Sequence, residues 1–112
     1  MLPCSSETVV TREEAAFVIR RILARQAPLE QTSHFWDQRV RRGYRYADAI
    51  KILRWHTMEG IPSYDFDHDN HVVRLRGTSY DGRDTRLVLG MRWIRRNNLI
   101  TIIDIEGIGE EI

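Results

Sequence analysis

The sequence predicts an α+β domain in which three N-terminal helices pack on a three- to four-stranded antiparallel sheet. Two observations predict this class: apolar residues recur at helical spacing in the first half of the chain, and they alternate with polar residues in the second half. With 112 residues, 42% of them hydrophobic, the chain can bury one core without disulfides. We expect residues 1–10 to be a flexible lead-in, residues 11–106 to form one globular domain and residues 107–112 to be an acidic tail.

The first helix is expected to begin after Thr11. The segment Thr11-Arg12-Glu13-Glu14 has the pattern of a capping box, in which the Thr11 hydroxyl and the Glu14 carboxylate satisfy free amide groups of the first turn. Apolar residues follow at helical spacing. The helix is expected to end near Gln26, before Pro28.

Two further helices are expected before the sheet. Thr32 and Ser33 predict the start of the second helix, and Gly43 predicts its end. The third helix is expected from about residue 46 to residue 58, followed by a loop or short irregular strand over residues 63–70. The tryptophans are expected to anchor the core, with stacking on nucleic-acid bases as the alternative. They are Trp36, Trp55 and Trp93.

Three strands complete the predicted domain, over residues 71–76, 86–94 and 99–105, and turn-like segments separate them. Because side chains alternate along a strand, Leu87 and Leu89 are expected to face the helices, while four arginines project from the other face. These arginines are Arg74, Arg76, Arg86 and Arg92. The sequence therefore predicts a basic sheet face.

Charge is segregated along the chain, although the net charge is only +1. Residues 74–96 hold seven basic and two acidic side chains, whereas residues 104–112 carry only acidic charges. Sixteen of the seventeen basic residues are arginine, whose planar guanidinium suits phosphate binding. A compositional preference for arginine explains the same bias, so both interpretations stay open.

Composition also limits where the protein acts. The longest apolar runs are far shorter than the roughly 20 residues that a membrane-spanning helix needs, so no membrane partner is expected. The first residues lack the cationic and apolar regions of a secretory signal, and a cytoplasmic location is expected. Cys4 is the single cysteine, which excludes an internal disulfide, and its position in the lead-in argues against a catalytic thiol.

Several short motifs occur in an order that resembles a known family. They are Thr32-Ser33-His34 leading into Arg39 and Arg42-Gly43, then Ala47 to Leu53, Val73 to Gly77, Asp81-Gly82-Arg83 and Ile100-Thr101-Ile102. Over roughly residues 14–105 the chain resembles the domain-of-unknown-function family 4258, which is similar in outline to RelE-like toxin domains. The resemblance implies helices on an antiparallel sheet, and it suggests RNA cleavage by the toxin of a toxin–antitoxin module, with a cognate antitoxin as partner. Phe35 and Trp36 depart from the family pattern, and so does the acidic linker before the strands.

The candidate site follows from the needs of a metal-independent endoribonuclease, which are a base, an acid and cations for the charge on the phosphorane. His34 is the best acid–base candidate because it is expected at a helix start, where free amides also attract phosphate. The predicted catalytic residues are His34, Arg39, Arg42, Arg76 and Arg86. The predicted nucleic-acid-binding residues are Arg74, Arg76, Arg86, Arg92 and Tyr80. A structural role for His34, as a cap or a partner of a backbone carbonyl, is the alternative.

The other histidines and the function carry further alternatives. His68 and His71 lie in an aspartate-rich segment that suggests a metal, but no ligand pair at helical spacing supports it, so no metal or other cofactor is expected. His71 has the better claim as a second acid–base group, and His56 is expected to stabilise a helix end. The alternative function is a non-catalytic protein-binding accessory domain whose basic face docks an acidic partner.

Overall fold

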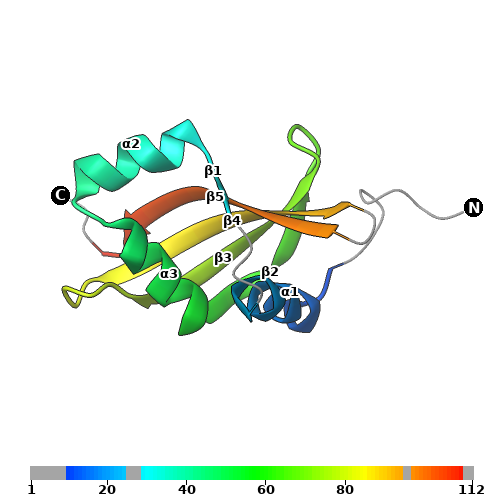
Figure 1. Cartoon of the computed structure of the whole chain (residues 1–112), viewed down its shortest axis with the longest axis horizontal. Coiled ribbons are helices and arrows are strands. Elements are labelled where there is room, and N and C mark those ends of the chain that lie inside the picture. The colour runs from blue at the N-terminus through cyan, green and yellow to red at the C-terminus, as the bar shows by residue number, and fades with distance from the viewer. Residues whose placement is uncertain (1–9, 25–28, 95–96, 110–112) are drawn as a thin grey trace, which may run out of the picture.

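The computed structural model describes residues 10–24, 29–94 and 97–109, except for the side chains of residues 93–98. Residues 1–9 of the expected lead-in and residues 110–112 of the expected acidic tail lie outside the described residues. Residues 95–96, part of the turn expected at residues 95–98, lie outside them as well. The described elements are α1 (Arg12–Ala24), β1 (Glu30–Gln31), α2 (Ser33–Arg42), α3 (Tyr46–Arg54), β2 (Thr57–Asp65), β3 (Asn70–Thr78), β4 (Asp84–Ile94) and β5 (Asn97–Gly107). Helices α1 and α3 pack against one face of the sheet, and α2 lies along β5 (Figure 1). No described helix is long and apolar enough to cross a membrane.

The sheet corrects the predicted architecture. The described strands form one five-stranded sheet in the order β1-β5-β4-β3-β2, and the sheet is mixed because β1 pairs parallel with β5. The helices are not all N-terminal to the sheet, since β1 separates α1 from α2. The expected antiparallel sheet of three to four strands is therefore wrong. The parallel strand β1 was missed because a strand of two residues is too short to show the alternation of polar and apolar residues.

Strand β2 occupies a segment that the sequence assigned partly to the third helix and partly to a loop. Helix α3 ends at Arg54, and β2 then pairs with β3 along its length. The register between them shifts between Glu59 and Ser63, and Gly60 has a φ of +64° within that irregularity. A bulge of this kind interrupts period-two alternation, which hides the strand from pattern analysis.

The structure confirms the residues predicted to cap α1 and α2. The amide of Glu14 donates to Oγ1 of Thr11 over 3.1 Å, and the amide of Thr11 donates to Oε1 of Glu14 over 3.1 Å, which confirms the capping box. At the start of α2, Oγ1 of Thr32 accepts a hydrogen bond of 3.0 Å from the amide of Phe35. Gly43 ends α2 with a φ of +73°, a conformation that glycine adopts without steric cost. The start of α2 is therefore fixed, and His34 stands in its first turn.

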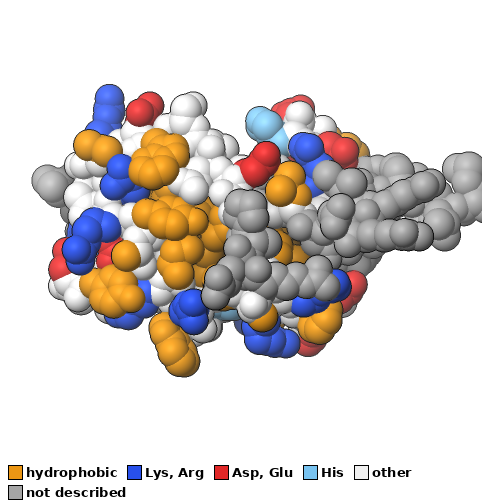
Figure 2. Space-filling model, viewed as in Figure 1, with side chains coloured by type: hydrophobic (Ala, Val, Ile, Leu, Met, Phe, Trp, Pro, Cys, Tyr) orange, Lys and Arg blue, Asp and Glu red, His pale blue; other side chains and the backbone are white. Residues whose placement is uncertain are grey.

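The core lies between the helices and one face of the sheet. Leu75, Leu87 and Leu89 are fully buried there, and each such side chain stabilises the fold by about 1.5–3 kcal/mol. Two tryptophans depart from the expected core positions, since Trp55 is 75% exposed and Trp36 is 42% exposed. Figure 2 shows that hydrophobic side chains do reach the surface of the helix-covered side. The side chain of Trp93 lies outside the described residues.

The opposite sheet face carries the arginines, as alternation predicted. Arg74, Arg76 and Arg92 are exposed and Arg86 is half-buried, while the leucines between them face the core. A register shift between β4 and β5 pairs Val88 with Asp104 but Leu89 with Ile102. This bulge inserts an extra residue into β5 and turns Asp104 toward the start of α2.

Candidate functional site

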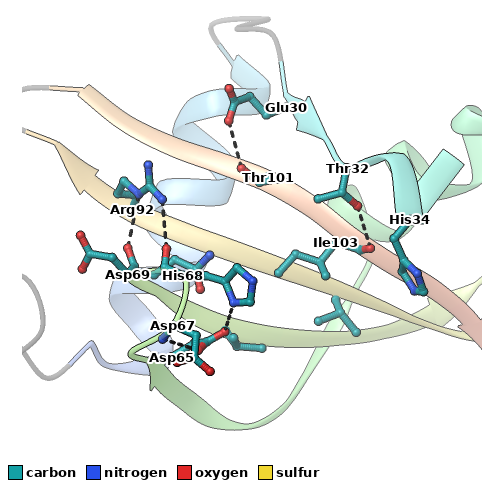
Figure 3. Close-up of a pocket in the computed structure, with 13 residues that line it drawn as sticks. Glu30, Thr32, His34, Asp65, Asp67, His68, Asp69, Arg92, Thr101 and Ile103 are labelled. Carbon is teal, nitrogen blue, oxygen red and sulfur yellow. Dashed lines mark hydrogen bonds and ion pairs between the residues drawn. The ribbon is translucent and has the colours of Figure 1, made fainter.

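A cavity of about 900 Å³ lies on the face of the sheet opposite α1 and α3. Its walls are the hairpin between β2 and β3 on one side and the start of α2 on the other (Figure 3). The floor is apolar, with Val72, Val88 and Ile103, and polar groups surround it. The polar lining residues are Glu30, Thr32, His34, Asp65, Asp67, His68, Asp69, Asn70, Arg92 and Thr101. A concave apolar floor with converging polar groups is the usual form of a ligand site.

His34 forms one side of the cavity and is held by the start of α2. Its Nε2 lies 3.3 Å from Oδ1 of Asp104 on β5, and its side chain is 58% exposed. Thr32, which caps the helix, also donates through Oγ1 to the carbonyl of Ile103 over 3.1 Å, so the helix start is fixed to the sheet. Nη1 of Arg42 lies 3.4 Å from the same Asp104 oxygen. One carboxylate therefore orients an imidazole and a guanidinium together.

His68 forms the opposite side of the cavity, on the β2–β3 hairpin. Its Nδ1 donates to Oδ2 of Asp65 over 2.8 Å, and its side chain is 74% exposed. The hydrogen bond from His68 lowers the pKa of Asp65 below its usual value, and the amide of Asp67 also donates to Asp65 over 3.0 Å. The carboxylate thus stays ionised over a wider acidic range, and His68 keeps its partner.

Arg92 fastens this hairpin to the sheet. Its Nη2 donates to the carbonyl of His68 over 3.0 Å, and its Nε donates to the carbonyl of Asp69 over 3.3 Å (Figure 3). Asp69 itself adopts a φ of +48°, which tightens the turn. The guanidinium therefore holds the turn that carries His68 above the apolar floor, and it adds a positive charge to the cavity.

The other predicted catalytic arginines lie elsewhere. Arg39 donates to the carbonyl of Tyr44 over 3.2 Å and stacks 4.3 Å from the ring centre of Trp36. Arg76 donates through Nε to Asp84 over 3.0 Å. Of the predicted catalytic set, the structure brings only His34 to the cavity, with Arg42 behind it through Asp104.

Arg86 is the centre of an ion-pair network on the sheet face. Its Nε donates to Glu59 over 2.5 Å and its Nη1 donates to Glu106 over 3.1 Å. These contacts lower the pKa of Glu59 and raise the pKa of the Arg86 guanidinium. Arg76 and Arg86, two of the four arginines of the predicted basic face, are thus neutralised by carboxylates of the same sheet. The linear sequence does not reveal these pairs, because cross-strand register sets them.

The predicted nucleic-acid-binding residues are spread over the molecule. Arg74 is exposed on β3 between Glu59 and Val88 of the neighbouring strands, and it forms no hydrogen bond or ion pair with the described residues. Tyr80 is 60% exposed in the turn between β3 and β4, where Nζ of Lys51 lies 5.1 Å from its ring centre. Arg92 alone of this set lines the cavity.

The roles of His68 and Asp104 at this site were not predicted from the sequence. His68 ranked below His71 as a second acid–base group, but His71 is buried and packs 5.2 Å from the ring of Tyr64. The spacing of Asp65 and His68 within a turn was the available signal for a hydrogen-bonded pair. Asp104 gave no signal, because its contact with His34 joins residues seventy positions apart through the β5 bulge.

The aspartate-rich segment does not gather metal ligands. No group of three or more His, Cys, Asp or Glu side chains suited to a metal ion occurs among the described residues. His56 meets the structural expectation, since its Nδ1 contacts the carbonyl of Leu53 at the end of α3 over 3.0 Å.

Comparisons of the chain with protein-family models, with curated proteins and with solved structures found no match.

Arg86→Met is expected to lower the free energy of unfolding by about 0.5–1 kcal/mol at neutral pH, because two partly exposed carboxylates lose their partner. Since the pKa of Glu59 is lowered in the folded state, this stabilisation is present above the usual carboxyl range and disappears as the pH falls through the lowered pKa. Urea unfolding at several pH values measures it. Arg74→Met, the control, should change stability by less than about 0.5 kcal/mol.

Proposed function

We propose that this protein is an RNA-interacting domain that cleaves RNA as a metal-independent endoribonuclease, with His34 and His68 as its acid–base groups. One observation carries the proposal: two exposed imidazoles, each beside its own carboxylate, face one cavity from opposite sides. A pair of such groups is what proton transfer at both ends of a reacting phosphodiester requires.

The two imidazoles divide the chemistry between them. One removes the proton from a ribose 2′-hydroxyl, whose oxygen then bonds to the adjacent phosphorus. The other donates a proton to the departing 5′-oxygen as its bond to phosphorus breaks, which leaves a 2′,3′-cyclic phosphate and a 5′-hydroxyl. Nε2 of His34 lies beside Asp104, and Nδ1 of His68 is hydrogen-bonded to Asp65, so Nδ1 of His34 and Nε2 of His68 are the atoms that face substrate in this scheme.

Arg92 supplies the positive charge in this scheme. Its guanidinium lines the cavity and is already ordered by two backbone carbonyls, so little reorganisation is needed when charge develops on phosphorus. Arg74 is a second cation for the flanking phosphate, because its cross-strand neighbour Val88 belongs to the cavity floor. Three carboxylates of the hairpin also line the cavity, so the site favours a single phosphate held by specific contacts over a broad electrostatic attraction.

The resemblance to family 4258 and to RelE-like toxins agrees with this chemistry and extends the proposal to a cellular role. In that role the chain is the toxin of a toxin–antitoxin module in the cytoplasm, and a cognate antitoxin blocks it. This part of the proposal depends on the motifs around His34 and Arg42-Gly43.

The direct test is cleavage of a labelled single-stranded RNA by the purified protein in the presence of a chelator. We expect products with 2′,3′-cyclic phosphate and 5′-hydroxyl ends, and no cleavage of the same sequence in DNA, which lacks the nucleophile. Products that carry a 5′-phosphate, or cleavage that stops when the chelator is added, would contradict the mechanism.

The second candidate function is a non-catalytic protein-binding accessory domain. The observation that favours it is the spread of Arg74, Arg76 and Arg86 over the sheet, none of which lines the cavity, because a docking surface needs no convergence. An acidic partner would replace the carboxylates that Arg76 and Arg86 now bind. Absence of RNA cleavage together with binding of an oligoglutamate peptide, lost in Arg74→Glu, would support this function over the first.

A further inference from the structure

We propose that the surface around Trp55 binds single-stranded RNA by stacking bases on exposed aromatic rings between cationic side chains. The surface comprises Trp55, Tyr80, Lys51, Arg20 and Arg54. It shares no residue with the cavity that holds His34 and His68. The inference rests on the proposed function, and it names where the nucleotides that flank the cleaved phosphodiester bind.

Trp55 is exposed to an extent that folding does not explain. It follows the last residue of α3, its amide donates to the carbonyl of Lys51 over 3.0 Å, and 75% of the residue contacts solvent. Tryptophan is among the side chains with most apolar area to gain from burial, so this exposed indole is available to stack on a flat ligand ring. At the lower edge of Figure 2, where α3 ends, hydrophobic side chains protrude beside those of Lys and Arg.

Trp55 lines two cavities. The first, of about 390 Å³, is lined by Trp55 together with Arg20, Arg54 and His56. The second, of about 430 Å³, is lined by Trp55 together with Lys51, Arg76 and Asp84. Trp55 therefore borders two hollows that both contain basic groups, and an aromatic ring beside cationic side chains is what a stacked base and its phosphates require.

The cations of this surface are available to a ligand. Arg20 and Arg54 are exposed and form no hydrogen bond or ion pair with the described residues. Nζ of Lys51 donates to the carbonyl of Ser79 over 3.2 Å. Because a carbonyl carries no net charge, the positive charge of Lys51 is not compensated by this bond. The first cavity has no carboxylate among its lining residues, and Asp84, which lines the second, is already bound by Arg76.

The aromatic rings decide between a nucleic acid and an acidic peptide. Lys51 lines the second cavity with Trp55 and also lies 5.1 Å from the ring centre of Tyr80, so it stands between two exposed aromatic residues. Alternating rings and cations match the alternating bases and phosphates of a single strand. An acidic peptide would use the cations but would give the rings no partner.

The test uses binding without cleavage, so that it is independent of the cavity chemistry. A fluorescent 2′-O-methyl RNA of roughly 12 nucleotides lacks the free 2′-hydroxyl and cannot be cut by the proposed mechanism. Fluorescence anisotropy should show that the full chain binds it, that Trp55→Ala weakens the affinity about 5- to 100-fold, and that Trp55→Phe retains most of it. Arg54→Ala should reduce the slope of log affinity against log salt by about 0.7.

Trp36→Ala is the matched control, because Trp36 is also partly exposed and also lies beside an arginine, but it lines neither cavity. It should leave the affinity unchanged. Equal affinities of Trp55→Ala and the parent chain would overturn the inference even if RNA cleavage is observed. Binding of an oligoglutamate peptide in place of the oligonucleotide would overturn it as well. Binding that depends on Trp55 with no RNA cleavage would sustain this surface and refute the endoribonuclease.

Discussion

His34→Ala is expected to reduce the rate of RNA cleavage by about 10²–10⁴-fold, which is the usual contribution of a positioned acid–base group. The imidazole stands in the first turn of α2, where Asp104 orients it and the capped helix start fixes its backbone. Its side chain is 58% exposed, so the truncation leaves the core intact and the variant should remain folded. Single-turnover cleavage of a labelled RNA, with the unfolding transition of the variant measured alongside, gives the result.

His34→Gln separates proton transfer from a purely structural role. A glutamine amide can donate a hydrogen bond to Asp104, but it cannot exchange a proton with a substrate at neutral pH. We therefore expect His34→Gln to be as impaired as His34→Ala. If glutamine restores cleavage, His34 acts as a structural cap or positioning group, and the acid–base assignment is wrong.

The parts of the fold that the sequence predicted correctly are those specified by residues close together along the chain. Thr11 and Thr32 cap their helices, and Gly43 ends α2 in the left-handed conformation, all through contacts within a few positions. The two-residue strand β1 has no such local signal, because its pairing with β5 joins residues about seventy positions apart. A sheet order that depends on distant pairing lies beyond what periodicity in a sequence can predict.

The site was predicted only in part for the same reason. His34 carries a local signal, since a histidine after a capping threonine belongs to a helix start. Asp104 reaches it only because a bulge in β5 shifts the register beside Val88. The carboxylates that neutralise Arg86 lie on two different strands, so a basic face inferred from alternation alone overestimates the free charge.

Trp55 illustrates a further limit. Its position within the apolar stripe of the helix expected over residues 46–58 suggested a core residue, but α3 ends at Arg54 and the chain then turns into β2. The exact end of a helix decides whether the next side chain faces the core or solvent, and helix ends are the least predictable feature of an element. An error of a few residues at this boundary therefore concealed an exposed aromatic side chain.

His68→Ala is expected to reduce cleavage by about 10²–10⁴-fold as well, and to remove one limb of the bell-shaped dependence of rate on pH. A reaction that needs one protonated and one neutral imidazole is fastest between the two titrations, so loss of either group leaves a profile with a single limb. Because His68 lowers the pKa of Asp65, that carboxylate stays ionised as the pH falls below its usual range, and the pair persists on the acidic side of the profile. The pH–rate profile of the parent chain and of each single variant measures this.

Asp67→Asn is the matched control for His68, since Asp67 lies on the same hairpin and lines the same cavity but carries no imidazole. Loss of its negative charge should leave the shape of the pH profile unchanged and should, if anything, favour a phosphate ligand. If His68→Ala retains the parent rate and both limbs, then the second proton is carried by another group, and the two-imidazole mechanism is wrong. If His34→Ala and His68→Ala each abolish a different limb, the two histidines act at opposite ends of the same phosphodiester.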